Sequence, residues 1–123
     1  MKRLFLFLMI IEILAQSGFA QKYDVNLISK NTELNFFETN MRGIKHHQII
    51  YFAEKDLQTI SAYKNGKLLW QTNVISVCGK PSVGKSEIRY IKYESNKLFV
   101  IFGKHSFAKI DVENGKTEFE GSD

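Results

Sequence analysis

Residues 87–93 read Glu-Ile-Arg-Tyr-Ile-Lys-Tyr, so apolar and charged side chains nearly alternate along them. Successive side chains of a strand point to opposite faces, and this alternation therefore predicts a strand with one buried and one solvated face. Residues 107–112, Phe-Ala-Lys-Ile-Asp-Val, repeat the pattern. Ile49–Phe52 and Leu98–Phe102 are instead unbroken β-branched and aromatic runs, which predicts central strands covered on both faces.

Short polar pairs separate these segments. Asn-Gly at 65–66 and at 114–115 predicts two tight hairpins, because both residue types tolerate the positive φ angles of a type I′ turn. Ser-Asn at 95–96 predicts a third turn, and Lys-Asp at 55–56 a fourth. The fold class that follows is all-β: a small antiparallel meander or sandwich of about seven to nine short strands.

The composition of the chain sets its class. It has 123 residues, with one proline and one cysteine. Hydrophobic residues make up 44% of the chain, and aromatic residues make up 13%. This is too apolar for a disordered chain, and one cysteine excludes a disulfide framework or a cysteine-rich zinc site. We expect one β-rich domain over residues 21–123, within which residues 31–40 fit either a helix or a strand.

The first twenty residues have the layout of a secretory signal peptide. Lys2 and Arg3 precede an apolar run from Leu4 to Leu14, and Gly18-Phe19-Ala20 places small residues before a cut ahead of Gln21. The apolar run is shorter than the ~20 residues that cross a bilayer. We therefore expect export, to the periplasm or outside the cell, with no membrane span in the mature chain.

A weak internal repeat links the two halves of this domain. Asn-Gly-Lys occurs at 65–67 and at 114–116, an aromatic residue follows each glycine at the same distance (Trp70 and Phe119), and an apolar run precedes each triplet at the same offset. Residues 49–73 and 98–120 thereby resemble blade repeats of pyrroloquinoline-quinone-type β-propellers. That resemblance implies blade-like strand units. A closed propeller needs at least about four blades, so two units imply no quinone site.

Residues 79–86, Gly-Lys-Pro-Ser-Val-Gly-Lys-Ser, match the phosphate-binding loop pattern at every defined position. In such loops, backbone N–H groups hold the phosphates at the N-terminus of a following helix. Residues 74–78 predict a strand before the loop, but residues 87–93 predict another strand after it rather than a helix. We expect a connecting loop. The alternative is a nucleotide-binding protein that uses Gly79, Gly84, Lys85 and Ser86.

Other chemically capable residues lack the spacing of a site. His46, His47 and His105 show no metal-ligand spacing, and Cys78 has no local partner for nucleophilic catalysis. We predict no metal, no cofactor and no catalytic residues. Tyrosines among lysines are compatible with a stacking surface for single-stranded nucleic acid or glycans, although at strand spacing they more often cover a sheet; they are Tyr51, Tyr63, Tyr90 and Tyr93.

Charge is uneven along the chain, whose formal net charge is +4. Bases predominate between residues 80 and 109, and acids predominate from Asp111 onward. A basic face attracts an acidic partner. The candidate partner-binding residues are Lys80, Lys85, Arg89 and Lys92.

These observations favour a small exported binding domain without enzymatic activity, of the accessory, inhibitor or immunity type. It would act on another protein, not on nucleic acid, through a sheet face or the 79–86 loop. The alternatives are an enzyme that uses nucleotide or the Cys78 thiol, and a β-subunit whose exposed edges self-associate into a larger assembly.

Overall fold

A computed structural model describes residues 23–123, and the signal peptide predicted over residues 1–20 lies outside this range. The described chain contains ten strands, one single-turn 3-10 helix and one short α-helix. In chain order they are η1 Val25–Leu27, β1 Ile28–Ser29, β2 Glu33–Asn35, β3 Gly43–His46, β4 Ile49–Ala53, β5 Thr59–Lys64, β6 Lys67–Asn73, α2 Val74–Cys78, β7 Ile88–Glu94, β8 Lys97–Phe102, β9 Ser106–Asp111 and β10 Thr117–Ser122.

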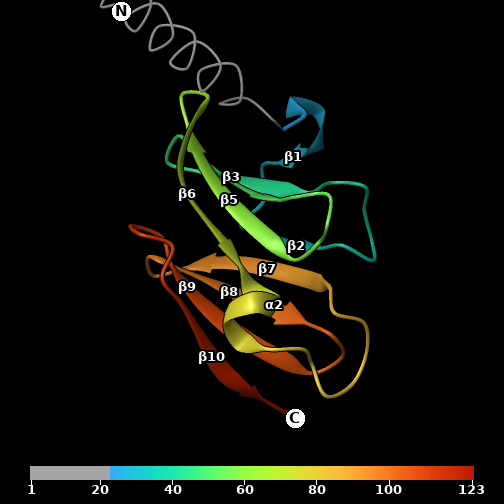
Figure 1. The fold of residues 1–123 in the computed structure, drawn as a ribbon. Coiled ribbons are helices and arrows are strands. Elements are labelled where there is room, and N and C mark those ends of the chain that lie inside the picture. Colours follow the sequence, from blue (N-terminus) through green and yellow to red (C-terminus); the bar gives the residue numbers. More distant parts are fainter. Residues whose placement is uncertain (1–22) are drawn as a thin grey trace, which may run out of the picture.

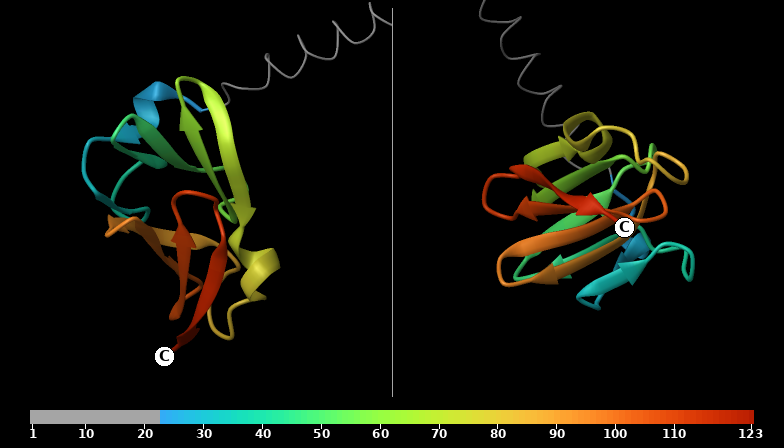
Figure 2. Two further views of the ribbon diagram at one scale, coloured as in Figure 1. Left: turned by 90° about the vertical axis from the view of Figure 1, so that its left-hand side faces the viewer. Right: turned by 90° about the horizontal axis from the view of Figure 1, so that it is seen from below.

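The strands form two five-stranded sheets, one above the other in Figure 1. The first sheet has the order β1-β3-β4-β5-β6, and the second has the order β10-β9-β8-β7-β2. All neighbours are antiparallel except β1 and β3. Each sheet contains a four-stranded meander, and α2 with the loop after it joins the two (Figure 2). The predicted all-β, mostly antiparallel class is thus confirmed.

The hydrophobic core lies between the sheets. Its cluster takes alternate side chains from both, including Ile44, Tyr51, Ile60, Trp70, Ile91, Leu98, Val100, Phe102 and Ile110. Trp70 ties the sheets together, because its indole Nε1 donates to the carbonyl oxygen of Val112 at 2.8 Å. The ring lies against Gly115, where an added Cβ would stand 2.7 Å from indole carbons.

Burial differs between the two apolar runs. On β4, Tyr51 and Phe52 face opposite sides and both are buried. On β8, buried residues alternate with half-buried ones, so Phe99 and Ile101 remain partly exposed. The predicted coverage of both faces is therefore right for β4 and wrong for β8, because no described segment crosses the outer face of the second sheet.

Most predicted turns are confirmed. The pairs 65–66 and 95–96 have positive φ at both residues and close the β5–β6 and β7–β8 hairpins, and residues 55–56 form a turn. The pair 114–115 is different. Gly115 alone has positive φ, and its N–H donates to the carbonyl of Asp111, which closes a longer turn than the predicted two-residue one.

Two further segments form short elements, one a strand and one a helix. Residues 33–35 of the undecided 31–40 segment form β2. Residues 74–78, predicted as a strand, form helix α2, so that prediction is wrong. The side chain of Asn73 accepts a hydrogen bond from the Ser76 N–H and caps the helix, and Val74 and Ile75 are buried. A run of apolar residues this short does not by itself distinguish a strand from a buried helical turn.

Candidate functional site

The loop of residues 79–87 is fixed against one end of the second sheet. The Lys104 N–H donates to the carbonyl of Val83 at 2.8 Å, and the Gly103 N–H donates to the carbonyl of Glu87 at 2.9 Å. The Arg89 guanidinium donates to the carbonyl of Lys104 at 2.8 Å. These hydrogen bonds hold three backbone segments in one arrangement. Binding therefore costs less conformational entropy than it would with a mobile loop.

Glycines permit this close approach. A Cβ at Gly103 would stand 2.3 Å from a side-chain carbon of Pro81, and one at Gly84 would stand 2.6 Å from the Lys104 nitrogen. Both glycines also have positive φ. Gly84 and Pro81 therefore shape the loop to fit the β8–β9 turn, which is a structural reason for residues that also match a phosphate-binding pattern.

A groove of about 570 Å³ opens between this loop, the β8–β9 turn and the segment after β2. We call it the β8–β9 groove; its lining residues are Phe37, Val83, Gly84, Lys85, Glu87, Ile88, Arg89, Gly103, Lys104 and His105. The Phe37 side chain is 78% exposed and Val83 is 48% exposed. Large apolar side chains are costly to leave in water, so the groove offers anchoring surface to a binding partner.

The groove is also cationic. Lys85, Arg89 and Lys104 line it, and Glu87 is its one carboxylate. Within residues 23–123 the ion pairs are Lys92–Glu94, Lys97–Asp111 and Lys109–Glu120, so the three groove cations have no carboxylate partner there. The arrangement favours a ligand that brings negative charge and an apolar group together.

The predicted partner-binding residues divide in space. Lys85 and Arg89 come together in the groove. Lys80 is exposed on the same loop but does not line the groove. Lys92 lies on β7, where its ammonium nitrogen is 3.9 Å from a carboxylate oxygen of Glu94. Phe37 and Lys104 were not singled out in the sequence. No local pattern identifies them, because the groove joins three segments distant along the chain.

The structure around the phosphate-loop pattern lacks a helix after Ser86. The next element is β7, and the Ile88 N–H donates to the carbonyl of Leu57 at 2.6 Å. The Glu87 N–H donates to the Lys85 carbonyl, and the Ser86 carbonyl accepts from the side chain of Gln58. These groups are engaged in folding the loop. Gly79, Gly84, Lys85 and Ser86 therefore do not lie at a helix N-terminus, where aligned N–H groups bind phosphate.

The histidines and the cysteine are dispersed. His46 stacks on Tyr93 with ring centroids 3.8 Å apart, and burial with His47 nearby lowers the pKa of His46. His105 lines the groove. Over residues 23–123, no three histidine, cysteine or carboxylate side chains are grouped so that they could hold a metal ion. Cys78 is half-buried, and burial raises the pKa of its thiol, which disfavours the thiolate.

Two of the four tyrosines considered for a stacking surface are inaccessible. Tyr51 is 1% exposed in the core, and Tyr63 is 2% exposed beneath Tyr23. Tyr90 and Tyr93 are partly exposed, but the Tyr90 hydroxyl donates to Glu33 and the Tyr93 hydroxyl donates to Asn96. A continuous row of four stacking rings is therefore not formed.

No protein-family model, curated protein or solved structure matches the chain. Among the described residues, none of the helices has the length and apolar character needed to cross a membrane.

Proposed function

We propose that the protein is a non-enzymatic binding domain, exported from the cell, that attaches to an acidic segment of another protein through the β8–β9 groove. The observation that carries the proposal is the groove itself. It places Lys85, Arg89 and Lys104 beside the exposed side chains of Phe37 and Val83 on a backbone fixed by hydrogen bonds.

Each part of the groove has a role in this proposal. The unpaired cations attract a carboxylate-bearing segment and accelerate its association, since electrostatic complementarity acts mainly on the rate of encounter and on partner choice. Phe37 and Val83 then anchor an apolar side chain of that segment by excluding water. The fixed loop limits the conformational entropy lost on binding.

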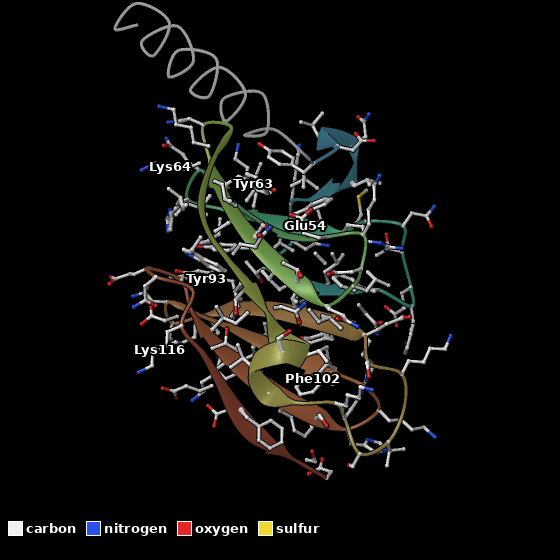
Figure 3. The ribbon with its side chains drawn as sticks, viewed as in Figure 1. Glu54, Tyr63, Lys64, Tyr93, Phe102 and Lys116 are labelled. Atoms are coloured by element: carbon white, nitrogen blue, oxygen red, sulfur yellow. The ribbon has the colours of Figure 1, made fainter. Side chains whose placement is uncertain are left out.

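The test compares two charge-reversed variants of equal net charge. Lys85→Glu with Lys104→Glu alters the groove, while Lys64→Glu with Lys67→Glu alters the β5–β6 hairpin of the first sheet, where Lys64 lies (Figure 3). Envelope and secreted extracts of the source cell are passed over each immobilised protein, and bound proteins are quantified by mass spectrometry. Lysines at both places are exposed, so neither variant removes a buried contact.

We expect the groove variant to lose at least about tenfold of a captured acidic protein, because reversing two charges converts attraction to repulsion. The hairpin variant should retain it, and the captured protein should elute as salt is raised. Equal capture by the wild-type protein and the groove variant would remove the groove from the proposed function.

A further inference from the structure

β10, the last strand of the described residues, carries negative charge that complements the cationic β8–β9 groove. β10 and the residue after it carry Glu118, Glu120 and Asp123, with no lysine or arginine from residue 117 to residue 123. Phe119, between the first two of these acids, is 51% exposed. β10 is an edge strand, paired on one side only with β9.

This acidic edge does not occupy the groove of its own chain. Neither Glu118 nor Phe119 lines the groove, because pairing with Lys109 and Ala108 of β9 fixes both residues along the edge of the sheet. The end of β10 nevertheless lies beside the groove. The Asp123 N–H donates to the carbonyl of His105, a groove residue, at 3.0 Å. The C-terminal end of β10 and the β8–β9 turn thus lie at the same end of the second sheet (Figure 1).

We propose that the groove binds the acidic edge of a second copy of this chain, so that two copies form a reciprocal dimer. A two-fold axis between groove and edge brings each edge to the other copy's groove, which yields two identical contacts per dimer. In each contact Lys85 and Lys104 face the carboxylates of Glu118 and Asp123. Phe119 does not take part, because it pairs with Ala108 on the opposite face of the sheet from Glu118 and lies against Phe102. The inference rests on the groove of the proposed function and assigns it an additional occupant.

Dimerisation and capture of another acidic protein then compete for one site. Both ligands need the same cations, so the free protein is partly blocked by its own copies at high concentration. The charged side chains of this contact are exposed on the free protein. The contact therefore belongs to the weak class of interfaces, and added salt should screen it.

The experiment is a charge exchange measured by sedimentation equilibrium. The purified protein is examined at concentrations on the order of 10 µM to 1 mM, a range suited to weak association. Three proteins are compared: the wild type, the groove variant Lys85→Glu with Lys104→Glu, and an edge variant Glu118→Lys with Asp123→Lys. Glu120 is left unchanged because its carboxylate lies 3.2 Å from the Lys109 ammonium.

We expect the wild-type mass to rise from one chain toward two with concentration, and to fall back when salt is raised. Each variant alone should remain a single chain, since its grooves and edges now carry the same sign of charge. Mixing the two variants should restore the dimer, because each contact in the mixed pair again joins opposite charges. The hairpin variant Lys64→Glu with Lys67→Glu should dimerise as the wild type does.

A wild-type mass of one chain at the highest concentration overturns the dimer. So does a mixture of the two variants that stays monomeric while the wild type associates. These results are independent of the proposed function. A monomer whose groove variant still loses a captured protein refutes this inference alone, whereas a dimer whose groove variant captures proteins unchanged refutes the proposed function alone.

Discussion

On the outer face of the first sheet, the ring of Tyr23 packs on Phe52 and Tyr63, with centroids 5.9 Å and 4.8 Å apart. On the outer face of the second sheet, Phe99 and Phe107 remain half-exposed. The strands beneath the two faces are similarly apolar in sequence. The difference comes from the segment that carries Tyr23, which precedes the meander of the first sheet and packs on its outer face. An apolar strand is therefore covered on both faces only where a segment distant in the sequence packs against it.

The covered face also holds a polar network. The Glu54 carboxylate accepts hydrogen bonds from the Ser61 hydroxyl at 2.6 Å and from the Tyr63 hydroxyl at 2.9 Å, and the Gln71 amide donates to Ser61 at 2.9 Å. Glu54 and Tyr63 are labelled in Figure 3. Ser61 is fully buried. A buried hydroxyl must be hydrogen-bonded to avoid a large desolvation cost, so this network makes the buried outer face of the first sheet possible.

The largest effect is expected at Trp70, the residue that joins the two sheets. Trp70→Ala should lower the free energy of unfolding by about 3–5 kcal/mol, because it removes a buried ring and its hydrogen bond to Val112. Trp70→Phe is the control, since it keeps most of the packing and should cost less. Urea unfolding of the three proteins measures both values. If Trp70→Ala unfolds like the wild type, the sheets are not held together by this contact.

The contrast between outer faces can be measured directly with two phenylalanines. Phe52→Ala should cost about 3 kcal/mol, because Phe52 is buried beneath Tyr23, whereas Phe99→Ala should cost about 1 kcal/mol on the open face. Thermal and urea unfolding give the comparison. Equal losses would mean that the second sheet's outer face is covered in solution, and dimer measurements at several concentrations would then identify its cover.

The two Asn-Gly turns provide a third comparison. Gly115→Val should destabilise the protein by about 2–3 kcal/mol and Gly66→Val by about 1–2 kcal/mol, because both positions have positive φ, while a side chain at Gly115 also collides with Trp70. Comparing Gly115→Ala in the wild-type background with Gly115→Ala in the Trp70→Ala background separates the two causes. Removing the indole should relieve the collision and leave the cost of positive φ.

How far the sequence predicts this molecule depends on whether a feature is local. The strand predicted at 87–93 and the turn pairs at 65–66 and 95–96 are confirmed, because strand and φ preferences act within a few residues. The alternation of buried and exposed residues in that strand is interrupted by a bulge between Ile88 and Tyr90. Helix α2 was missed, since its formation depends on the Asn73 cap and on burial of Val74 and Ile75 against other elements. The hairpin turn at His47-Gln48 has two positive φ angles but contains no glycine, so the sequence does not predict it.

The candidate site divides in the same way. Lys85 and Arg89 follow from charge along the sequence, whereas Phe37 and Lys104 enter the groove only because β2 crosses to the second sheet and the β8–β9 turn abuts the loop. Residues 79–86 also match the phosphate-binding loop pattern in sequence. Gly84 and Pro81 are explained by close packing on Lys104 and Gly103, and Gly79 by its positive φ at the end of α2.

The covered face should respond to alkaline pH. Burial raises the pKa of Tyr63 to about 12, and its hydrogen bond to Glu54 adds to the shift. Above the ordinary tyrosine pKa the unfolded chain releases this proton while the folded chain retains it, so stability should be complete below about pH 10 and fall between about pH 10 and 12. Unfolding measured against pH should show a shallower fall in Tyr63→Phe. Because the pKa of Tyr51 is also raised to about 12, some dependence should remain in that variant.

The smallest effect is expected in the loop with the phosphate-binding pattern. Replacing Lys80 and Lys85 by alanine should change the free energy of unfolding by less than about 0.5 kcal/mol, because both side chains are exposed and neither forms an ion pair within residues 23–123. The wild-type protein should not bind ATP or GTP in the presence of Mg²⁺, as measured by calorimetry. A single exposed ammonium contributes only about 1 kcal/mol at contact distance in water, and the chain beyond Ser86 enters β7 rather than a helix. Saturable nucleotide binding at micromolar concentration that disappears in Lys85→Ala would contradict this, since it would require the loop to rearrange away from Gly103 and Lys104.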